Sequence, residues 1–222
     1  RVVGEIEPDK LIREISTDTR SLDKAELFFA LAGKSFDGHD FIKEAIEKRV
    51  RYFIISDTEK IPVEFKRSAV FIVVQDTLKA YGDLAKFYRQ KFKIPAVAIT
   101  GSSGKTTVKE LTAQLLSQSF NVLKNKGTEN NLIGVPKTIF QLKTQHEVLV
   151  LEMGTSLPGE IDRLSSIIAP QIGVVTQIGL AHLEGFGSQE GIQEEKLKVL
   201  NQLERGGTLI LNGQDPFLKE VK

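Results

Sequence analysis

The sequence predicts an α/β fold in two parts, the second of which is built on a mainly parallel sheet. From Pro95 onward, short apolar runs typical of strands alternate with stretches of helical periodicity. Such alternation is typical of a parallel sheet covered by helices on both faces. The dipeptide Ile94-Pro95 closes an amphipathic segment, because the residue before a proline is disfavoured in the helical region. We therefore expect one domain over residues 1–94, including a connecting helix, and a second, incomplete domain over residues 95–222.

The first part is predicted to be a small α/β unit. Apolar, strand-like runs occur at Leu27–Leu31, Tyr52–Ile55 and Val70–Val74. Helical periodicity covers Asp40–Lys48, and a longer amphipathic helix is predicted over Thr77–Lys93.

The second part is predicted to contain several strands whose carboxyl ends meet at one edge. The expected strands are Ala96–Thr100, Val148–Leu151, Ile172–Thr176 and Thr208–Leu211, and a helix is expected over Val108–Ser117. Open α/β sheets bind ligands outside the carboxyl ends of their strands. Polar clusters that follow these strands should therefore converge on one site.

Composition narrows the class of protein. The 222 residues are 41% hydrophobic and 27% charged with a net charge of +1, so charge provides no argument for a nucleic-acid partner. No apolar run approaches the roughly 20 residues of a membrane span, and no signal peptide is visible. The absence of cysteine excludes disulfides and a cysteine nucleophile, and it fits a cytoplasmic protein. Because the chain opens at Arg1 and its only methionine is Met153, we expect a fragment cut at both ends.

The stretch from Ala96 to Thr107 predicts a phosphate-binding loop. An apolar strand leads into a glycine-serine turn, which delivers a lysine and two threonines to a helix start: Gly101, Ser102, Ser103, Gly104, Lys105, Thr106 and Thr107. Backbone amides and the positive helix end can face an anion there, while Lys105 neutralises outer phosphates and the Thr106 hydroxyl ligates Mg²⁺. The first glycine of the general spacing would fall at Ile99, so the loop is shortened. The alternative is an ordinary glycine-rich turn.

Three further residues follow the predicted strands or lie beyond them. Glu152 follows a strand and can hold Mg²⁺, although it can also be a helix cap or a loop carboxylate. His182 lies among glycines, where it is either a metal or phosphate contact or a structural side chain. Composition alone makes Lys196 a solvated helix lysine, and His39 and His146 have no context that suggests a function. The residues by themselves thus predict an ATP- or GTP-dependent enzyme of undefined substrate.

Several motifs, in order along nearly the whole chain, resemble those of the Mur ligases, the ATP-dependent enzymes that add amino acids to the bacterial cell-wall precursor. The motifs are Ile15–Arg20, Leu27–His39, Thr100–Thr107, Thr128–Pro136, Leu151–Gly154 and Ala181–Gly187. The segment Thr128–Pro136, with its Asn-Asn pair and Ile-Gly-Val-Pro, resembles the branch that adds D-alanyl-D-alanine. The resemblance implies a uridine-binding domain followed by a truncated P-loop ATPase domain.

The resemblance also implies roles for individual residues. Lys105 and Thr106 would hold the ATP phosphates and a first Mg²⁺, with Glu152 and His182 completing the metal shell. Lys196 matches a lysine that some Mur ligases carry as a carbamate, which could ligate a second Mg²⁺. Asn130 and Asn131 would lie where nucleotide and acceptor meet. The uridine nucleotide would lie near Thr17, Thr19, Lys34, Ser35 and Phe36.

The implied reaction joins D-alanyl-D-alanine to the carboxylate of a UDP-N-acetylmuramoyl-tripeptide through an acyl phosphate, with ATP and Mg²⁺ as cofactors. The alternatives are another Mur-superfamily ligase, including a folylpolyglutamate synthase-like enzyme, and a nucleotide-binding module without ligase activity. Mur ligases have a third domain that completes the ATP and amine sites, so we expect this chain alone to be inactive. We further expect a monomer with small-molecule substrates and no membrane insertion.

Overall fold

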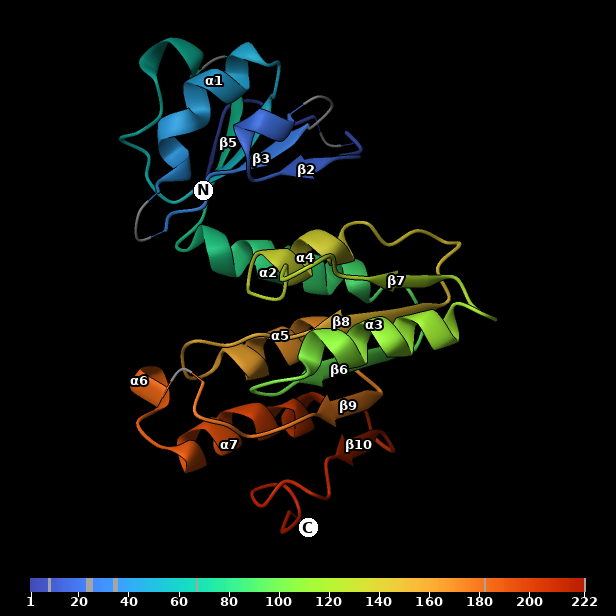
Figure 1. The fold of residues 1–222 in the computed structure, drawn as a ribbon. Helices are drawn as coiled ribbons and strands as arrows, with labels where there is room; N and C mark the ends of the chain where they lie inside the picture. The colour runs from blue at the N-terminus through green and yellow to red at the C-terminus, as the bar shows by residue number, and fades with distance from the viewer. Residues whose placement is uncertain (8, 23–25, 34–35, 67, 182, 222) are drawn as a thin grey trace. The chain divides into compact units, whose positions relative to one another are not determined.

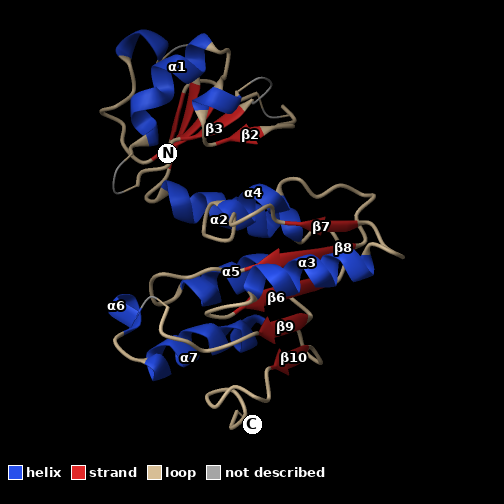
Figure 2. Cartoon of the chain, in the orientation of Figure 1, coloured by secondary structure: helices blue, strands red, loops and turns tan. Residues whose placement is uncertain are grey.

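The computed structural model describes residues 1–7, 9–22, 26–33, 36–66, 68–181 and 183–221. The chain forms two compact units, Arg1–Tyr81 and Gly82–Lys222, each with a sheet of its own (Figure 1). The predicted α/β class is confirmed, because helices and strands alternate in both units (Figure 2). Among the helices that the structure describes, none is both long and apolar enough to cross a membrane.

The first unit is built on a sheet with the strand order β1-β5-β4-β3-β2. Its strands are β1 (Val2–Val3), β2 (Ile15–Ser16), β3 (Leu27–Phe29), β4 (Tyr52–Ile55) and β5 (Val70–Val73). All neighbours are parallel except the antiparallel pair of β1 and β5. The helical segments are η1 (Thr19–Ser21), η2 (Gly38–Phe41), α1 (Ile42–Glu47) and η3 (Val63–Phe65). The aromatic rings of Phe28, Phe53 and Phe71 pack in succession and form much of the core.

The second unit is built on a sheet with the order β10-β9-β6-β8-β7, in which each pairing is parallel. Its strands are β6 (Ala96–Thr100), β7 (Val122–Lys124), β8 (Val148–Glu152), β9 (Ile172–Val175) and β10 (Thr208–Leu211). The central strand β6 lies between β8 and β9, so the chain leaves it toward opposite sides of the sheet. This is the topological switch point at which parallel α/β sheets bind ligands.

Helices cover both faces of the second sheet. They are α2 (Thr77–Arg89), α3 (Lys105–Leu116), α4 (Gly134–Ile139), α5 (Glu160–Ile168), α6 (Leu183–Phe186) and α7 (Gln189–Leu197), followed by the 3₁₀ turn η4 (Lys198–Gln202). Helix α3 covers one face of the sheet (Figure 1). On this face Ala113 packs on Val97 and Val150. Side chains from α4, α5 and α7 pack on the other face. The buried residues alternate along β6 because successive side chains of a strand point to opposite faces.

The structure corrects two helix boundaries. The long helix α2 ends at Arg89 rather than near Ile94-Pro95, and the Arg89 guanidinium donates to the carbonyls of Phe92, Ile94 and Ile168. The Arg89 side chain therefore stabilises a non-helical connection between the end of α2 and Pro95, so the helix ends before the residue that Pro95 would restrict. Helix α3 begins at Lys105 instead of Val108, so Lys105 and the two threonines form its first turn.

The boundary between the two compact units falls within α2, between Tyr81 and Gly82, which is earlier in the chain than the predicted domain boundary at residues 94 and 95. The second half of α2 packs with the second unit, since Ala85 lies in its core and the Tyr88 hydroxyl donates to the Leu142 carbonyl at 2.8 Å. The domain limits 1–94 and 95–222 thus remain a prediction. The short strands β1, β2 and β7 and the helix α4 were not predicted.

Candidate active site

The turn between β6 and α3 has a shape that only glycine allows at two positions. Gly101 and Gly104 adopt φ values of +146° and +81°, which L side chains rarely populate. A Cβ atom on Gly101 would also lie 2.0 Å from the Thr176 hydroxyl oxygen. The glycines of the predicted phosphate loop are therefore required by the local backbone and by close packing.

Hydrogen bonds from the segment that follows β9 hold the loop in place. The Thr176 hydroxyl donates to the Ser103 carbonyl at 2.5 Å, and the Ser102 amide donates to the Gln177 carbonyl at 2.7 Å. The Gly179 amide donates to the Ser102 hydroxyl at 2.8 Å. These bonds fix the loop before any ligand binds, as an anion site made of backbone amides requires.

The first turn of α3 supplies the cationic side of this loop. The first amides of a helix have no partner within the helix and carry its positive dipole end. Lys105 lies in this turn, and its ammonium donates to the Gly101 carbonyl at 2.8 Å and lies 3.4 Å from the Ser102 carbonyl. Its charge is thus placed over the turn, where a phosphate chain would lie.

Glu152, the last residue of β8, is adjacent to the loop although it is distant in sequence. Its side chain is buried, because β8 pairs with β6 in a register that sets Glu152 beside Ile99. One carboxylate oxygen accepts the Thr106 hydroxyl at 2.9 Å, and the other accepts the Asn130 amide at 2.7 Å. Thr106 and Glu152 together offer hard oxygen donors beside a phosphate site, which is the donor set that Mg²⁺ prefers.

Magnesium would therefore fit at Thr106 and Glu152. Among the described residues, no group of three or more His, Cys, Asp or Glu side chains could hold a metal ion. A Mg²⁺ ion bound by few protein ligands ordinarily takes its remaining ligands from phosphates and water. His182, the third predicted metal ligand, lies outside the described residues.

The two predicted asparagines have different environments. Asn130 bonds to Glu152 as above, and a Cβ on Gly154 would lie 2.6 Å from its side-chain oxygen, so Gly154 makes room for it. The Asn131 side chain accepts the amides of Ile133 and Gly134 and caps the start of α4. Asn130 reaches the candidate metal site directly, whereas Asn131 also shapes the backbone beside it.

Lys196 is buried on α7, which contradicts the solvated position expected from composition. Burial and, to a smaller extent, the nearby Lys105 ammonium together lower the pKa of Lys196 from its ordinary value to about 8, while the Glu195 carboxylate opposes the shift. Lys196 and Lys105 line one cavity of about 330 Å³ with Asn130, Asn131 and residues after β8. With Gly101 and Ser102, which also line it, the fold thus brings six of the predicted residues to one cavity from three separate segments.

The predicted uridine-binding residues lie in the first unit. Thr17 is partly buried, and Thr19 is buried with its hydroxyl donating to the Glu44 carboxylate at 3.1 Å. Phe36 is 70% exposed, and its ring stacks on Phe41 with centroids 5.3 Å apart and an interplanar angle of 4°. Lys34 and Ser35, which were predicted beside Phe36, lie outside the described residues.

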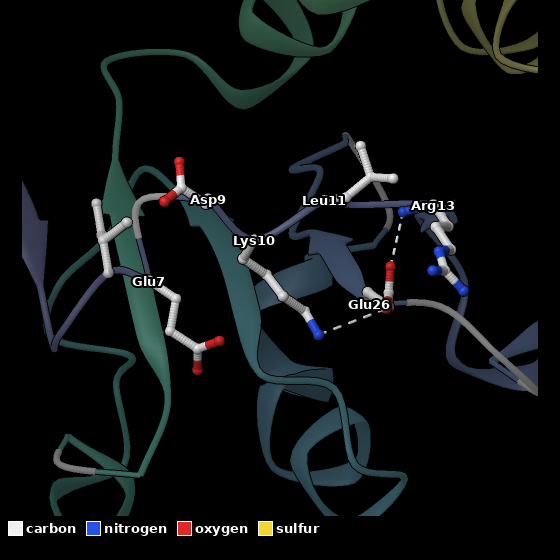
Figure 3. A pocket seen from close by; sticks show the side chains of 7 residues that line it. Glu7, Asp9, Lys10, Leu11, Arg13 and Glu26 are labelled. Atoms are coloured by element: carbon white, nitrogen blue, oxygen red, sulfur yellow. Dashed lines mark hydrogen bonds and ion pairs between the residues drawn. The ribbon is translucent and has the colours of Figure 1, made fainter.

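The first unit also has a shallow hollow that the sequence did not indicate (Figure 3). The Glu26 carboxylate in this hollow already has partners: the Arg13 backbone N–H donates to it at 2.6 Å, and the Lys10 ammonium lies 3.8 Å from it. Lys10 and Arg13 approach the same carboxylate in Figure 3. These contacts join the segment after β1 to the start of β3 and need no ligand.

Two buried polar residues beside the site were missed. Lys109 and Asn125 are fully buried and contact Glu152 or its backbone. Lys109 lies one helical turn beyond Lys105, so its position on the same face as the phosphate loop could have been read from helical spacing. No comparable signal marked Asn125.

Two family models match the chain: the Mur ligase middle domain over residues 99–222, and the Mur ligase family catalytic domain over residues 11–89. The first match covers more than half of the chain, so the chain belongs to the Mur ligase family.

Curated relatives are named UDP-N-acetylmuramoyl-tripeptide--D-alanyl-D-alanine ligase. The Bacillus subtilis relative is 40% identical over 211 residues, which are 95% of this chain and 46% of that protein. The Synechocystis relative is 42% identical over 220 residues, which are 99% of this chain and 48% of that protein.

Solved structures of MurF are similar to this fold. MurF from Acinetobacter baumannii matches with a TM-score of 0.88 and 34% identity, over 96% of this chain and 46% of that one. MurF from Thermotoga maritima, solved in complex with ADP, matches with a TM-score of 0.84 and 33% identity, over 94% of this chain and 48% of that one. The chain spans about half the length of the curated relatives it matches.

Proposed function

We propose that this chain is part of an ATP-dependent ligase that joins D-alanyl-D-alanine to the tripeptide carboxylate of a UDP-N-acetylmuramoyl-tripeptide. The observation that carries the proposal is the contact of Thr106 and Asn130 with the buried Glu152 carboxylate beside a preformed phosphate loop. The similarity to relatives named for this reaction, at 40% and 42% identity, supports the choice of substrates.

The reaction would run through an acyl phosphate. The acceptor carboxylate attacks the γ-phosphorus of ATP, and ADP leaves. The amine of D-alanyl-D-alanine then attacks the acyl carbon, loses a proton and displaces phosphate. Two anions approach each other in the first step, so Lys105 and the loop Gly101–Thr107 stabilise charge on the transferred phosphoryl group. Mg²⁺ held at Thr106 and Glu152, with His182 as a further ligand, would neutralise the same phosphates.

Lys196 would contribute as a carbamate. The neutral form needed to attack CO₂ is accessible near pH 8 because burial lowers its pKa to about that value. The nitrogen bonds to the carbon of CO₂ and releases a proton, which leaves a carboxylate. That group would supply oxygen ligands for a second Mg²⁺ in the cavity shared with Lys105.

The first unit would bind the uridine nucleotide. Phe36 presents an exposed aromatic ring already stacked on Phe41, which suits contact with a base. Thr17, Thr19, Lys34 and Ser35 complete the proposed set, and Asn131 would lie with Asn130 where nucleotide and acceptor meet. We assign this role to a domain of residues 1–94 and ATP binding to residues 95–222. A cytoplasmic monomer without nucleic-acid partners completes the proposal.

Phosphate release from ATP tests the proposed reaction. The full-length gene product should release phosphate only when both the UDP-N-acetylmuramoyl-tripeptide and D-alanyl-D-alanine are present. An amine screen with single amino acids in place of D-alanyl-D-alanine separates this reaction from those of other Mur ligases. Faster release with a single amino acid would contradict the assigned substrate.

A further inference from the structure

A buried ammonium lies next to the candidate site and has no role in the reaction proposed above. Lys109 is fully buried on α3, and its Nζ donates to the carbonyls of Asn125 at 2.9 Å and Gly127 at 3.1 Å. The same atom lies 3.8 Å from a carboxylate oxygen of Glu152 and 3.1 Å from Glu110. The ammonium therefore bridges the segment after β7 and the end of β8.

A core lysine requires a specific reason. Removing an ammonium from water is costly unless its donors are satisfied and a counter-charge is close, and an apolar side chain of similar volume is often as stable. The Lys109 ammonium has three donors, and two of them are used on carbonyls of one irregular segment. Methionine could fill the space but could not bond these carbonyls.

The same segment is joined to Glu152 by a second buried side chain. The Asn125 side-chain amide forms two hydrogen bonds with the backbone of Glu152: its oxygen accepts from the Glu152 N–H at 3.0 Å, and its nitrogen donates to the Glu152 carbonyl at 3.1 Å. It also donates to the Glu129 carbonyl at 2.9 Å, directly before Asn130. Lys109 and Asn125 thus hold both ends of a segment, residues 125–131, whose Asn130 then bonds the Glu152 carboxylate.

We propose that Lys109 is a positioning residue that holds residues 125–131 against β8, so that Asn130 and Glu152 are kept in place beside the phosphate loop. The inference rests on the proposed function for its kinetic consequence but not for its structural one. Two of the Lys109 donors are directed to backbone carbonyls, and the ammonium also lies 3.1 Å from Glu110 and 3.8 Å from Glu152. Lys109 therefore acts on the ligand site through Asn130 and Glu152.

The structural consequence is tested by hydrogen–deuterium exchange on the full-length protein. In Lys109→Met, amides of residues 126–131 should exchange about tenfold faster, while those of α5 remain unchanged. Lys126→Met is the matched control, because Lys126 is an exposed lysine in the same segment. Unchanged exchange in a folded Lys109→Met protein, or an equal increase throughout the chain, would overturn the proposal.

The kinetic consequence separates positioning from general stability. Lys109→Met should lower kcat about tenfold or more and raise the Mg²⁺ concentration for half-maximal rate, while KM for ATP changes less than about threefold because the phosphate loop is intact. If the wild type has no ligase activity, the proposed function fails, but the exchange test still decides the role of Lys109.

A second pair of variants covers the case in which Lys109→Met does not fold. Asn125→Ala and Lys109→Gln act on the same segment, so their effects on exchange of residues 126–131 should be less than additive in the double variant. Additive effects would show that the two residues act separately and would contradict the shared role.

Discussion

Three lysines that lie in helices, Lys105, Lys109 and Lys196, have different environments in this protein. Lys105 begins α3 and extends over the phosphate loop, Lys109 is fully buried one turn later, and Lys196 is buried on α7. Charge alone does not distinguish these residues. What distinguishes them is the surroundings of the ammonium: that of Lys109 is bonded to buried backbone carbonyls, and that of Lys196 is buried near the Lys105 ammonium.

Replacing Lys105 tests the phosphate site at this scale. Lys105→Ala should lower turnover of the full-length enzyme by about 100-fold or more, because a preorganised charge at a transferring phosphate contributes roughly 3 kcal/mol to the barrier. Thermal unfolding should change little, since Lys105 packs on the loop surface rather than in the core. Lys126→Ala serves as the control, and more than about a tenth of wild-type turnover in Lys105→Ala would contradict the assignment.

The depressed pKa of Lys196 predicts a pH dependence of stability. The folded pKa is about 8 and the ordinary value is 10.5, so between these values the unfolded chain holds a proton that the folded chain lacks. The free energy of unfolding relative to Lys196→Met should therefore rise with pH across this window and be constant below it. Denaturant titrations in CO₂-free, metal-free buffer measure the difference, and a flat difference from pH 7 to 10.5 would contradict the burial of an ammonium.

At the scale of elements, the site depends on a strand, a glycine turn and a helix that are held by the segment after β9. The turn needs positive φ at Gly101, and the Thr176 hydroxyl fills the space beside it. A side chain there would either shift the loop or displace Thr176, and either change would misplace the backbone amides that we propose bind a phosphate.

Substituting that glycine gives the prediction at this scale. Gly101→Ala should destabilise the second unit by about 1–3 kcal/mol through backbone strain and steric overlap, and it should weaken ADP binding. Gly213→Ala is the matched control, because a Cβ at Gly213 meets no atom within 4 Å. Calorimetry with ADP and denaturant unfolding provide the two measurements. Equal behaviour of both variants would show that the turn tolerates a side chain.

At the scale of the molecule, two units have separate sheets and separate apolar cores. The proposed uridine site belongs to the first unit, and the phosphate loop belongs to the second. The uridine part of the acceptor and the ATP phosphates should therefore be bound by residues of different units.

Independent binding is the prediction for the whole chain. Phe36→Ala should weaken UDP-N-acetylmuramoyl-peptide binding by about 1 kcal/mol and leave ADP binding unchanged, because we propose that the exposed Phe36 ring contacts the base. Lys105→Ala should have the opposite pattern. Calorimetry of the 222-residue chain with each ligand decides the matter. Loss of UDP-sugar binding in Lys105→Ala would place that site in the second unit.

Local pattern was sufficient for much of the fold. The strands Tyr52–Ile55, Ala96–Thr100 and Thr208–Leu211 have the predicted bounds, since continuous apolar runs bounded by turn residues form strands that pair in parallel. The end of α2 was wrong because Arg89 bonds carbonyls of a turn whose geometry cannot be read from periodicity. Short edge strands such as β7 have too few residues to produce a pattern.

The sequence by itself determined the class of fold and the strand, turn and helix of the proposed phosphate loop, because alternating strands and helices and a Gly-Ser-Ser-Gly-Lys-Thr turn are local properties of the chain. Tertiary structure alone decided that Lys196 is buried, that Glu152 accepts the Thr106 hydroxyl, and that Lys109 joins β8 to the segment after β7. These properties arise between residues distant in sequence. Burial and pairing depend on which elements pack together, and spacing along the chain does not encode them.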